Sequence, residues 1–130
     1  MKESVVSMPF RYRLQKVLDF RINQKEEQRI RVQKAQAAVI KAEQDIARNN
    51  QLISDTKQGM RTADPSMYEF YDNYLKHLWE EAEKLEAIRV ELQAKLDEEI
   101  AKLVKCEQNV KVLEKNELLS YNIIIDFNYT

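Results

Sequence analysis

The side chains that most often carry out chemistry are scarce in this sequence. His77 is the only histidine, and Glu80 and Glu81 follow it about one helical turn later, without the second histidine or the cysteine that a metal site needs. Cys106 is the only cysteine, so it has no disulfide partner within the chain and no histidine near it in sequence to activate the thiol. A single glycine excludes a glycine-rich phosphate loop. We therefore expect no catalytic, metal or cofactor site and predict that the chain is not an enzyme.

The elements that must position any functional side chain are predicted to be helices. Charged residues make up 33% of the chain, and one glycine and two prolines are the only strong helix breakers. Residues 10–58 contain neither and are predicted to form helix 1. In the turn, residues 59–65, Gly59 is expected to end that helix, and Asp64 and Pro65 to start the next one. Helix 2 is predicted over residues 66–119.

The two ends of the chain are expected to lie outside these helices. Residues 1–9 are predicted to form an N-terminal extension. Residues 120–130 are rich in isoleucine and nearly uncharged, and their β-prone composition predicts an irregular tail. A frayed end is the favoured interpretation of this tail. A docking segment and a non-native end created by a reading-frame change are the alternatives.

Apolar residues recur along both predicted helices at alternating steps of about four and three residues, which is the heptad pattern of a coiled coil. The stripe of the first helix runs from Leu14 to Ile53, and the stripe of the second runs from Tyr71 to Val110. Two helices of similar length, joined by a short turn, can bury such stripes against each other. The sequence therefore predicts an all-α fold, a long antiparallel two-helix coiled-coil hairpin.

Folding the chain back around Thr62 predicts which stripe residues face each other. Residues whose numbers add up to about 124 then share a layer, so that Ile46 faces Leu78 and Lys25 faces Glu99. The latter pair would neutralise two charges within the seam. Three successive stripe positions around Lys25 are polar, which predicts a stretch that opens more readily than the seam near the turn.

Charge is divided unevenly along the chain, although the net charge is only −1. Residues 1–60 hold 12 basic and 7 acidic side chains, whereas residues 61–130 hold 9 and 15, so the two halves attract each other when they lie side by side. The basic residues are interspersed with acidic ones, which favours a solvated face over nucleic-acid binding. No segment has the roughly 20 apolar residues that span a bilayer, and no signal-peptide pattern opens the chain. We therefore expect a cytoplasmic protein.

Aromatic residues gather at the start of the second helix. They are Tyr68, Phe70, Tyr71, Tyr74 and Trp79. The favoured interpretation is that they thicken the core at the turn, and a partner-binding patch is the alternative.

The most distinctive stretch opens the first helix. Residues 10–21 are Phe-Arg-Tyr-Arg-Leu-Gln-Lys-Val-Leu-Asp-Phe-Arg, and Glu26 and Glu27 follow. Over roughly residues 8–30 the sequence resembles the start of the flagellar export protein FliJ family, in which an aromatic-rich segment leads through a Leu-Gln-x-Val-Leu element into a charged helix. Met8, Pro9 and Phe10 also look like the usual beginning of that family.

The resemblance implies a non-enzymatic stalk in the bacterial flagellar type III protein export apparatus. Members of the family bind the hexameric export ATPase, promote assembly of its ring, and link it to the export gate membrane protein. They also escort export chaperones. Such a protein is cytoplasmic, is peripheral to the cytoplasmic membrane through its partners, and serves flagellum biogenesis and motility.

On this resemblance, we expect contact with the ATPase near the start of the first helix. The candidate partner-binding residues are Phe10, Arg11, Tyr12, Arg13, Lys16 and Arg21. Leu14 and Leu18 either join this contact or pack into the seam. A general coiled-coil scaffold or chaperone unrelated to export is the alternative function.

Overall fold

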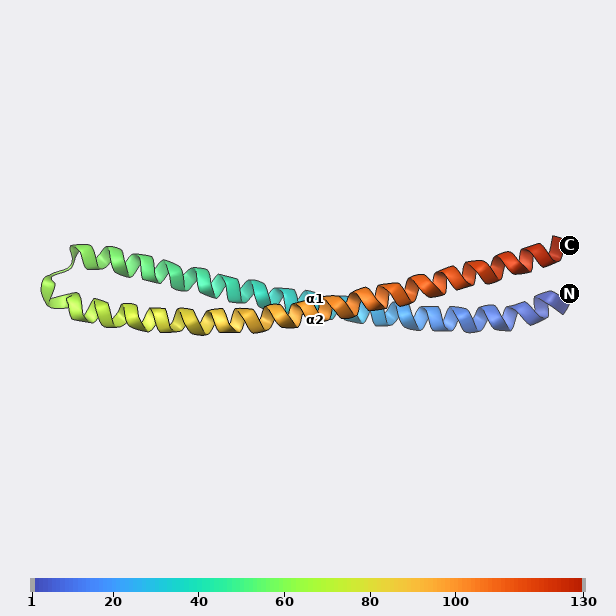
Figure 1. Cartoon of the computed structure of the whole chain (residues 1–130), viewed down its shortest axis with the longest axis horizontal. Helices are drawn as coiled ribbons and strands as arrows, with labels where there is room; N and C mark the ends of the chain where they lie inside the picture. Colours follow the sequence, from blue (N-terminus) through green and yellow to red (C-terminus); the bar gives the residue numbers. More distant parts are fainter. Residues whose placement is uncertain (1, 130) are drawn as a thin grey trace. The chain divides into compact units, whose positions relative to one another are not determined.

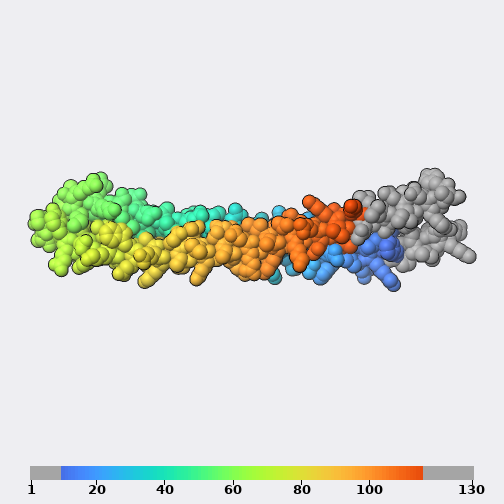
Figure 2. Space-filling model, in the orientation of Figure 1, coloured from blue at the N-terminus to red at the C-terminus, as the bar shows by residue number. Residues whose placement is uncertain are grey.

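A computed structural model describes the backbone of residues 2–129 (Figure 1) and the side chains of residues 10–115, which are the coloured part of Figure 2. Helix α1 spans Lys2–Thr62, the short 3₁₀ helix η1 spans Pro65–Met67, and helix α2 spans Tyr68–Tyr129. No strand occurs in residues 2–129. The two long helices pack against each other, which confirms the prediction of an all-α helical hairpin.

The composition of α1 and α2 explains why they form long helices. Residues with high helix propensity dominate, and Gly59 is the only glycine. Side chains four residues apart also bond along the exposed faces: Gln15 donates to Asp19 at 2.8 Å and Gln93 donates to Asp97 at 3.0 Å. Each such pair adds about 0.2–0.5 kcal/mol to helix stability.

The turn is built as the sequence predicts at Asp64 and Pro65. Asp64 has extended backbone angles, and its carboxylate accepts a hydrogen bond from the Ser66 amide at 3.3 Å. Pro65 occupies the start of η1, where the missing amide hydrogen has no intrahelical partner to lose. The Met67 amide then donates to the Asp64 carbonyl at 2.8 Å. This cap reverses the chain before α2 begins.

The end of α1 differs from the prediction. Gly59 has no positive φ and lies within the helix, which continues to Thr62. The predicted boundary at residue 58 is therefore wrong. A glycine inside a helix costs about 0.5–1 kcal/mol relative to alanine. Two features offset this cost: the helix continues for three more residues, and the Thr62 hydroxyl donates a hydrogen bond to the Gly59 carbonyl at 3.3 Å.

The outer boundaries also differ from those predicted. α1 begins at Lys2, so the backbone of the predicted extension is helical from there on, and α2 continues to Tyr129 through the predicted irregular tail. No glycine or proline follows Pro65, and isoleucine, tyrosine and phenylalanine each cost at most about 0.7 kcal/mol relative to alanine in a helix. The side chains of both segments lie outside those described.

The chain divides into two units, each of which pairs a segment of α1 with a segment of α2. The terminal unit consists of Met1–Val32 and Glu98–Thr130, and the turn unit consists of Gln33–Asp97. Because the chain reverses direction at η1, the two helical segments run antiparallel within each unit (Figure 1).

In each unit the core is the seam between its two helical segments, and the predicted stripes line it. In the terminal unit Leu18, Val110 and Leu113 form an apolar cluster against which half-buried Ile22 packs. In the turn unit the buried apolar residues are Val39, Ala42, Leu75, Leu78 and Leu96. Every buried residue among the described side chains lies on one of the two stripes, continued by the same steps to Thr56 and Leu113. The stripe prediction is confirmed.

The pairing register differs from the predicted one. Asn49, rather than Ile46, reaches Leu78, donating from Nδ2 to its carbonyl at 3.0 Å. Gln28, one stripe position beyond Lys25, donates to Glu99. Both pairs place α1 about three residues from the predicted alignment. The cause is the turn: α1 runs past Gly59 to Thr62 and α2 starts only at Tyr68, so the chain reverses later than a fold around Thr62 assumes.

Candidate functional site

The predicted partner-binding residues lie on α1 within the terminal unit. Phe10, Arg11, Tyr12, Arg13 and Lys16 are all exposed, and the Tyr12 side chain has 63% of its surface open to solvent. The Lys16 ammonium group lies over the Tyr12 ring, 4.8 Å from its centre, one helical turn away. This exposed segment therefore offers aromatic surface and positive charge together.

Arg21, the sixth candidate residue, bridges the two helices. It is half-buried on the stripe of α1, and its Nη1 donates to the backbone carbonyl of Asn109 on α2 at 3.2 Å. The guanidinium is thus already engaged within the terminal unit. We expect its side chain to position the helix rather than to reach a partner.

The leucines of this segment pack into the seam. Leu18 is only 7% exposed and belongs to the apolar cluster with Val110 and Leu113, and Leu14 is half-buried. Full burial of a leucine or valine side chain contributes about 1.5–3 kcal/mol to stability. The cluster therefore fixes α1 just after the exposed residues within 10–16, which lie on the same helix.

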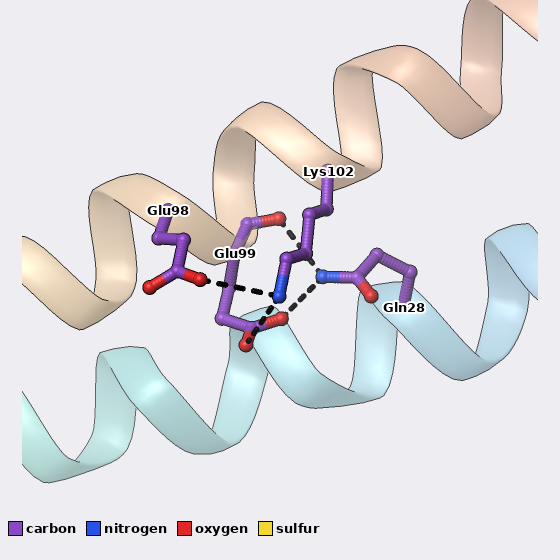
Figure 3. Close-up of polar contacts among 4 residues, drawn as sticks. All are labelled: Gln28, Glu98, Glu99 and Lys102. Carbon is purple, nitrogen blue, oxygen red and sulfur yellow. Dashed lines mark hydrogen bonds and ion pairs between the residues drawn. The ribbon is translucent and has the colours of Figure 1, made fainter.

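A polar contact lies at another position on the seam of the terminal unit (Figure 3). Gln28 and Glu99 are 6% and 5% exposed, and Gln28 Nε2 donates both to the Glu99 carbonyl, at 3.0 Å, and to the Glu99 carboxylate. Lys102 Nζ lies 3.3 Å from a Glu98 carboxylate oxygen and 3.9 Å from one of Glu99. Among the described residues no buried side-chain nitrogen or oxygen lacks a hydrogen-bond partner. Easier opening of this polar stretch stays a prediction that hydrogen exchange can test.

A groove of about 400 Å³ opens on one side of this polar contact. Its walls are Gln24, Glu27 and Arg31 of α1 and Lys102, Lys105 and Asn109 of α2. Gln28 and half-buried Cys106, both on the stripes, complete the lining. The charged side chains in this lining are three basic and one acidic, so the groove favours acidic groups.

The groups that line the groove are mainly charged and hydrogen-bonding groups. They are amides, ammonium and guanidinium groups, one carboxylate and one thiol, with neither a histidine nor a hydroxyl among them. His77, the only histidine, is exposed on α2 in the turn unit. No group of three or more His, Cys, Asp or Glu side chains within the described part of the chain is placed to hold a metal ion. No helix within that part is long and apolar enough to cross a membrane.

Sequence reasoning missed this groove, although the signal was present. Gln24 and Arg31 are seven residues apart, as are Lys102 and Asn109, and this spacing of about two helical turns puts each pair on one side of its helix. The spacing alone does not show that the two sides lie next to each other. That depends on the register, which the structure shifts by about three residues from the prediction.

The aromatic residues after the turn are mostly exposed. Only Tyr71 is half-buried: it stands beside Gly59, and its ring meets that of Phe70 edge-on with centres 6.1 Å apart. Lys57 Nζ lies 6.0 Å from the centre of the Trp79 ring. Core thickening therefore holds for Tyr71, whereas the others form a surface of the turn unit.

Arg89 is the charged stripe residue of the turn unit. Its Nε and Nη2 donate to the two carboxylate oxygens of Glu86 at 3.0 and 2.6 Å. These hydrogen bonds hold the pKa of Glu86 below its usual range. The two hydrogen bonds that Arg89 donates to Glu86, followed by the charge of Glu86, raise the pKa of Arg89, and the charge of Glu43 on α1 adds to this shift. Arg89 thus stays charged at the edge of the seam.

Comparison with models of known protein families, with curated protein sequences and with solved structures found no match to this chain.

Proposed function

We propose that this chain is a non-enzymatic coiled-coil stalk of the bacterial flagellar type III protein export apparatus. In this role it binds the hexameric export ATPase, links it to the export gate and escorts export chaperones. It works in the cytoplasm and reaches the membrane only through these partners.

One observation carries the proposal: the segment that resembles the FliJ family is the exposed face of an anchored helix. Phe10, Tyr12, Arg13 and Lys16 point to solvent, while Leu18 in the same stretch is locked into the core. A helix whose aromatic and basic residues are exposed, although burial would stabilise the aromatic ones, is typical of a protein-binding surface. The polar side chains described on the seam are placed in contacts between or along the two helices, which fits a protein that acts on the activity of another.

The test uses the purified chain and the flagellar export ATPase from the same organism. We expect the chain to promote assembly of the ATPase ring and to raise its rate of ATP hydrolysis. Reversing charge with R11E, R13E and K16E together should abolish the stimulation. The matched control is K34E, K41E and R48E, three exposed basic residues of α1 in the turn unit, which should leave stimulation intact. Absence of any effect at saturating chain concentration would refute the proposal.

The alternative is a coiled-coil scaffold or chaperone unrelated to export. Large apolar side chains away from the stripes favour it, because they suit contact with a further helix: Ile30, Ile40, Ile88 and Ile100 are each between 42% and 48% exposed. Affinity purification that returned the export ATPase would argue against this alternative. Purification of non-flagellar partners alone would favour it.

A further inference from the structure

We propose that the groove of the terminal unit is a docking site for an acidic amphipathic helix of a partner protein, which lies along it as a third helix. The groove is not an isolated hollow, because exposed apolar side chains continue its two walls. Seven residues make about two helical turns, so residues seven apart lie on the same side of a helix. On α1 this spacing leads from Gln24 back to Val17, and from Glu27 back to Phe20.

The other wall continues in the same way. On α2 the spacing leads from Lys105 to Val112. Val17, Phe20 and Val112 are 42%, 61% and 55% exposed. All three belong to the terminal unit and extend the groove toward the ends of the two helices. The surface therefore joins a polar, basic part to an apolar part.

Charge decides the chemistry of the partner. Arg31 and Lys105 face the groove, are exposed, and take part in no ion pair with another described residue. Lys102 already has Glu98 and Glu99 near it, so Arg31 and Lys105 are the cations available to a partner. Glu27 is the only carboxylate in the lining. A partner helix with acidic residues beside an apolar face matches this pattern, whereas a basic helix would be repelled.

The length of the surface sets the length of the partner segment. From residue 10, which lies seven before Val17, to Arg31 the wall on α1 runs about 30 Å, at about 1.5 Å per residue. A partner helix of about 20 residues would cover it. Binding requires only these features and not that the partner be an export ATPase, so it can be tested apart from the proposed function.

The test uses the full chain and two synthetic amphipathic helices of about 20 residues. Both carry the same leucine face, flanked by glutamates in one peptide and by lysines in the other. Cys106 is the only cysteine and lines the groove, so its rate of modification by a small thiol reagent reports occupancy. Fluorescence anisotropy of the labelled peptides gives their affinities.

We expect the acidic peptide to bind, to protect Cys106 from modification, and to bind more weakly as salt is raised. The variant R31E/K105E should weaken its binding at least about tenfold, because each reversal replaces attraction by repulsion. The matched control K111E/K115E reverses two exposed lysines of α2 that do not line the groove, and should keep the affinity. Circular dichroism checks that both variants stay helical.

Three results would overturn the proposal. The first is equal binding of the lysine peptide, and the second is that neither peptide protects Cys106. The third is self-association of the chain that protects Cys106 without any peptide, since the occupant would then be a second copy. Loss of ATPase stimulation with normal peptide binding would count against the export role and leave the groove assignment standing.

Discussion

Replacing Gly59 with alanine should stabilise the protein. Gly59 lies inside α1, three residues before its end, without the positive φ that would require glycine. A Cβ atom added there would lie 3.4 Å from Cε1, 3.5 Å from the hydroxyl oxygen and 3.8 Å from Cζ of Tyr71. These are van der Waals distances, so the methyl group fills space against the ring without forcing it to move.

The expected gain follows from helix propensity. Alanine is favoured over glycine in a helix interior by about 0.5–1 kcal/mol, mostly because glycine has more freedom to lose on folding. We therefore expect G59A to raise the free energy of unfolding by about 0.5–1 kcal/mol and the melting temperature by roughly 3 °C. Urea unfolding followed by far-ultraviolet circular dichroism should show a higher midpoint with an unchanged slope.

The control reverses the same change elsewhere on α1. Ala47 is exposed, so A47G should lower the free energy of unfolding by about 1 kcal/mol through propensity alone. A G59A protein less stable than the natural one would refute the helical assignment of Gly59. It would instead indicate a left-handed glycine that ends the helix, as sequence reasoning alone suggested.

Three further experiments probe the polar groups of the seam, with four variants in all. Q28L should destabilise the protein by about 1–3 kcal/mol, because the buried Glu99 carboxylate loses its amide donor. The double variant Q28L/E99L should recover this loss and exceed the stability of the natural protein by about 1 kcal/mol or more. Denaturant unfolding measures the free energy of unfolding of both variants. Equal destabilisation of the single and the double variant would contradict this prediction. N49L should raise stability by about 1–2 kcal/mol while letting other registers or oligomers form, which sedimentation would detect. The pKa of Glu86 is lower in the folded state than in the unfolded state. Its ionised carboxylate therefore stabilises the folded protein fully above the unfolded-state pKa, and this stabilisation disappears as the pH falls through the folded-state pKa. When the pH is lowered from about 6 to about 3, the free energy of unfolding of R89Q should therefore fall slightly less than that of the natural protein. High salt should reduce this difference, and an equal fall in both proteins would contradict the prediction.

The fold could be predicted because heptads act locally. Leucine or valine every three or four residues specifies which side of a helix is buried, whatever lies opposite, and the buried residues from Leu18 to Leu113 follow that rule. Polar Gln28 and Glu99 sit on the stripes as well, so their burial was foreseeable from position alone. Their contact with each other was not, because it depends on where the chain turns.

The register was missed because the end of α1 was predicted about one helical turn too early. Sequence alone gives Gly59 a strong stop signal, and the Tyr71 side chain standing beside it can be seen only once α2 is in place. Moving the end of α1 to Thr62 shifts each opposite pair, so the predicted Lys25–Glu99 layer becomes the observed Gln28–Glu99 contact. The groove escaped prediction with it, since its two walls meet only in the observed register.

The buried polar residues explain why one register is preferred over a slip by a full heptad. A slip in one direction would place Glu99 opposite Ala35, so the carboxylate would lose the Gln28 amide donor, at a cost of about 1–3 kcal/mol. A slip in the other direction would place it opposite Arg21, which would then leave the Asn109 carbonyl. Either slip moves the helices by about 10 Å along each other, which would pull apart η1 and the Asp64 cap between Thr62 and Tyr68. In the turn unit the turn and the Asn49–Leu78 hydrogen bond thus set the register, and in the terminal unit the Gln28–Glu99 contact adds the discrimination that an apolar stripe lacks.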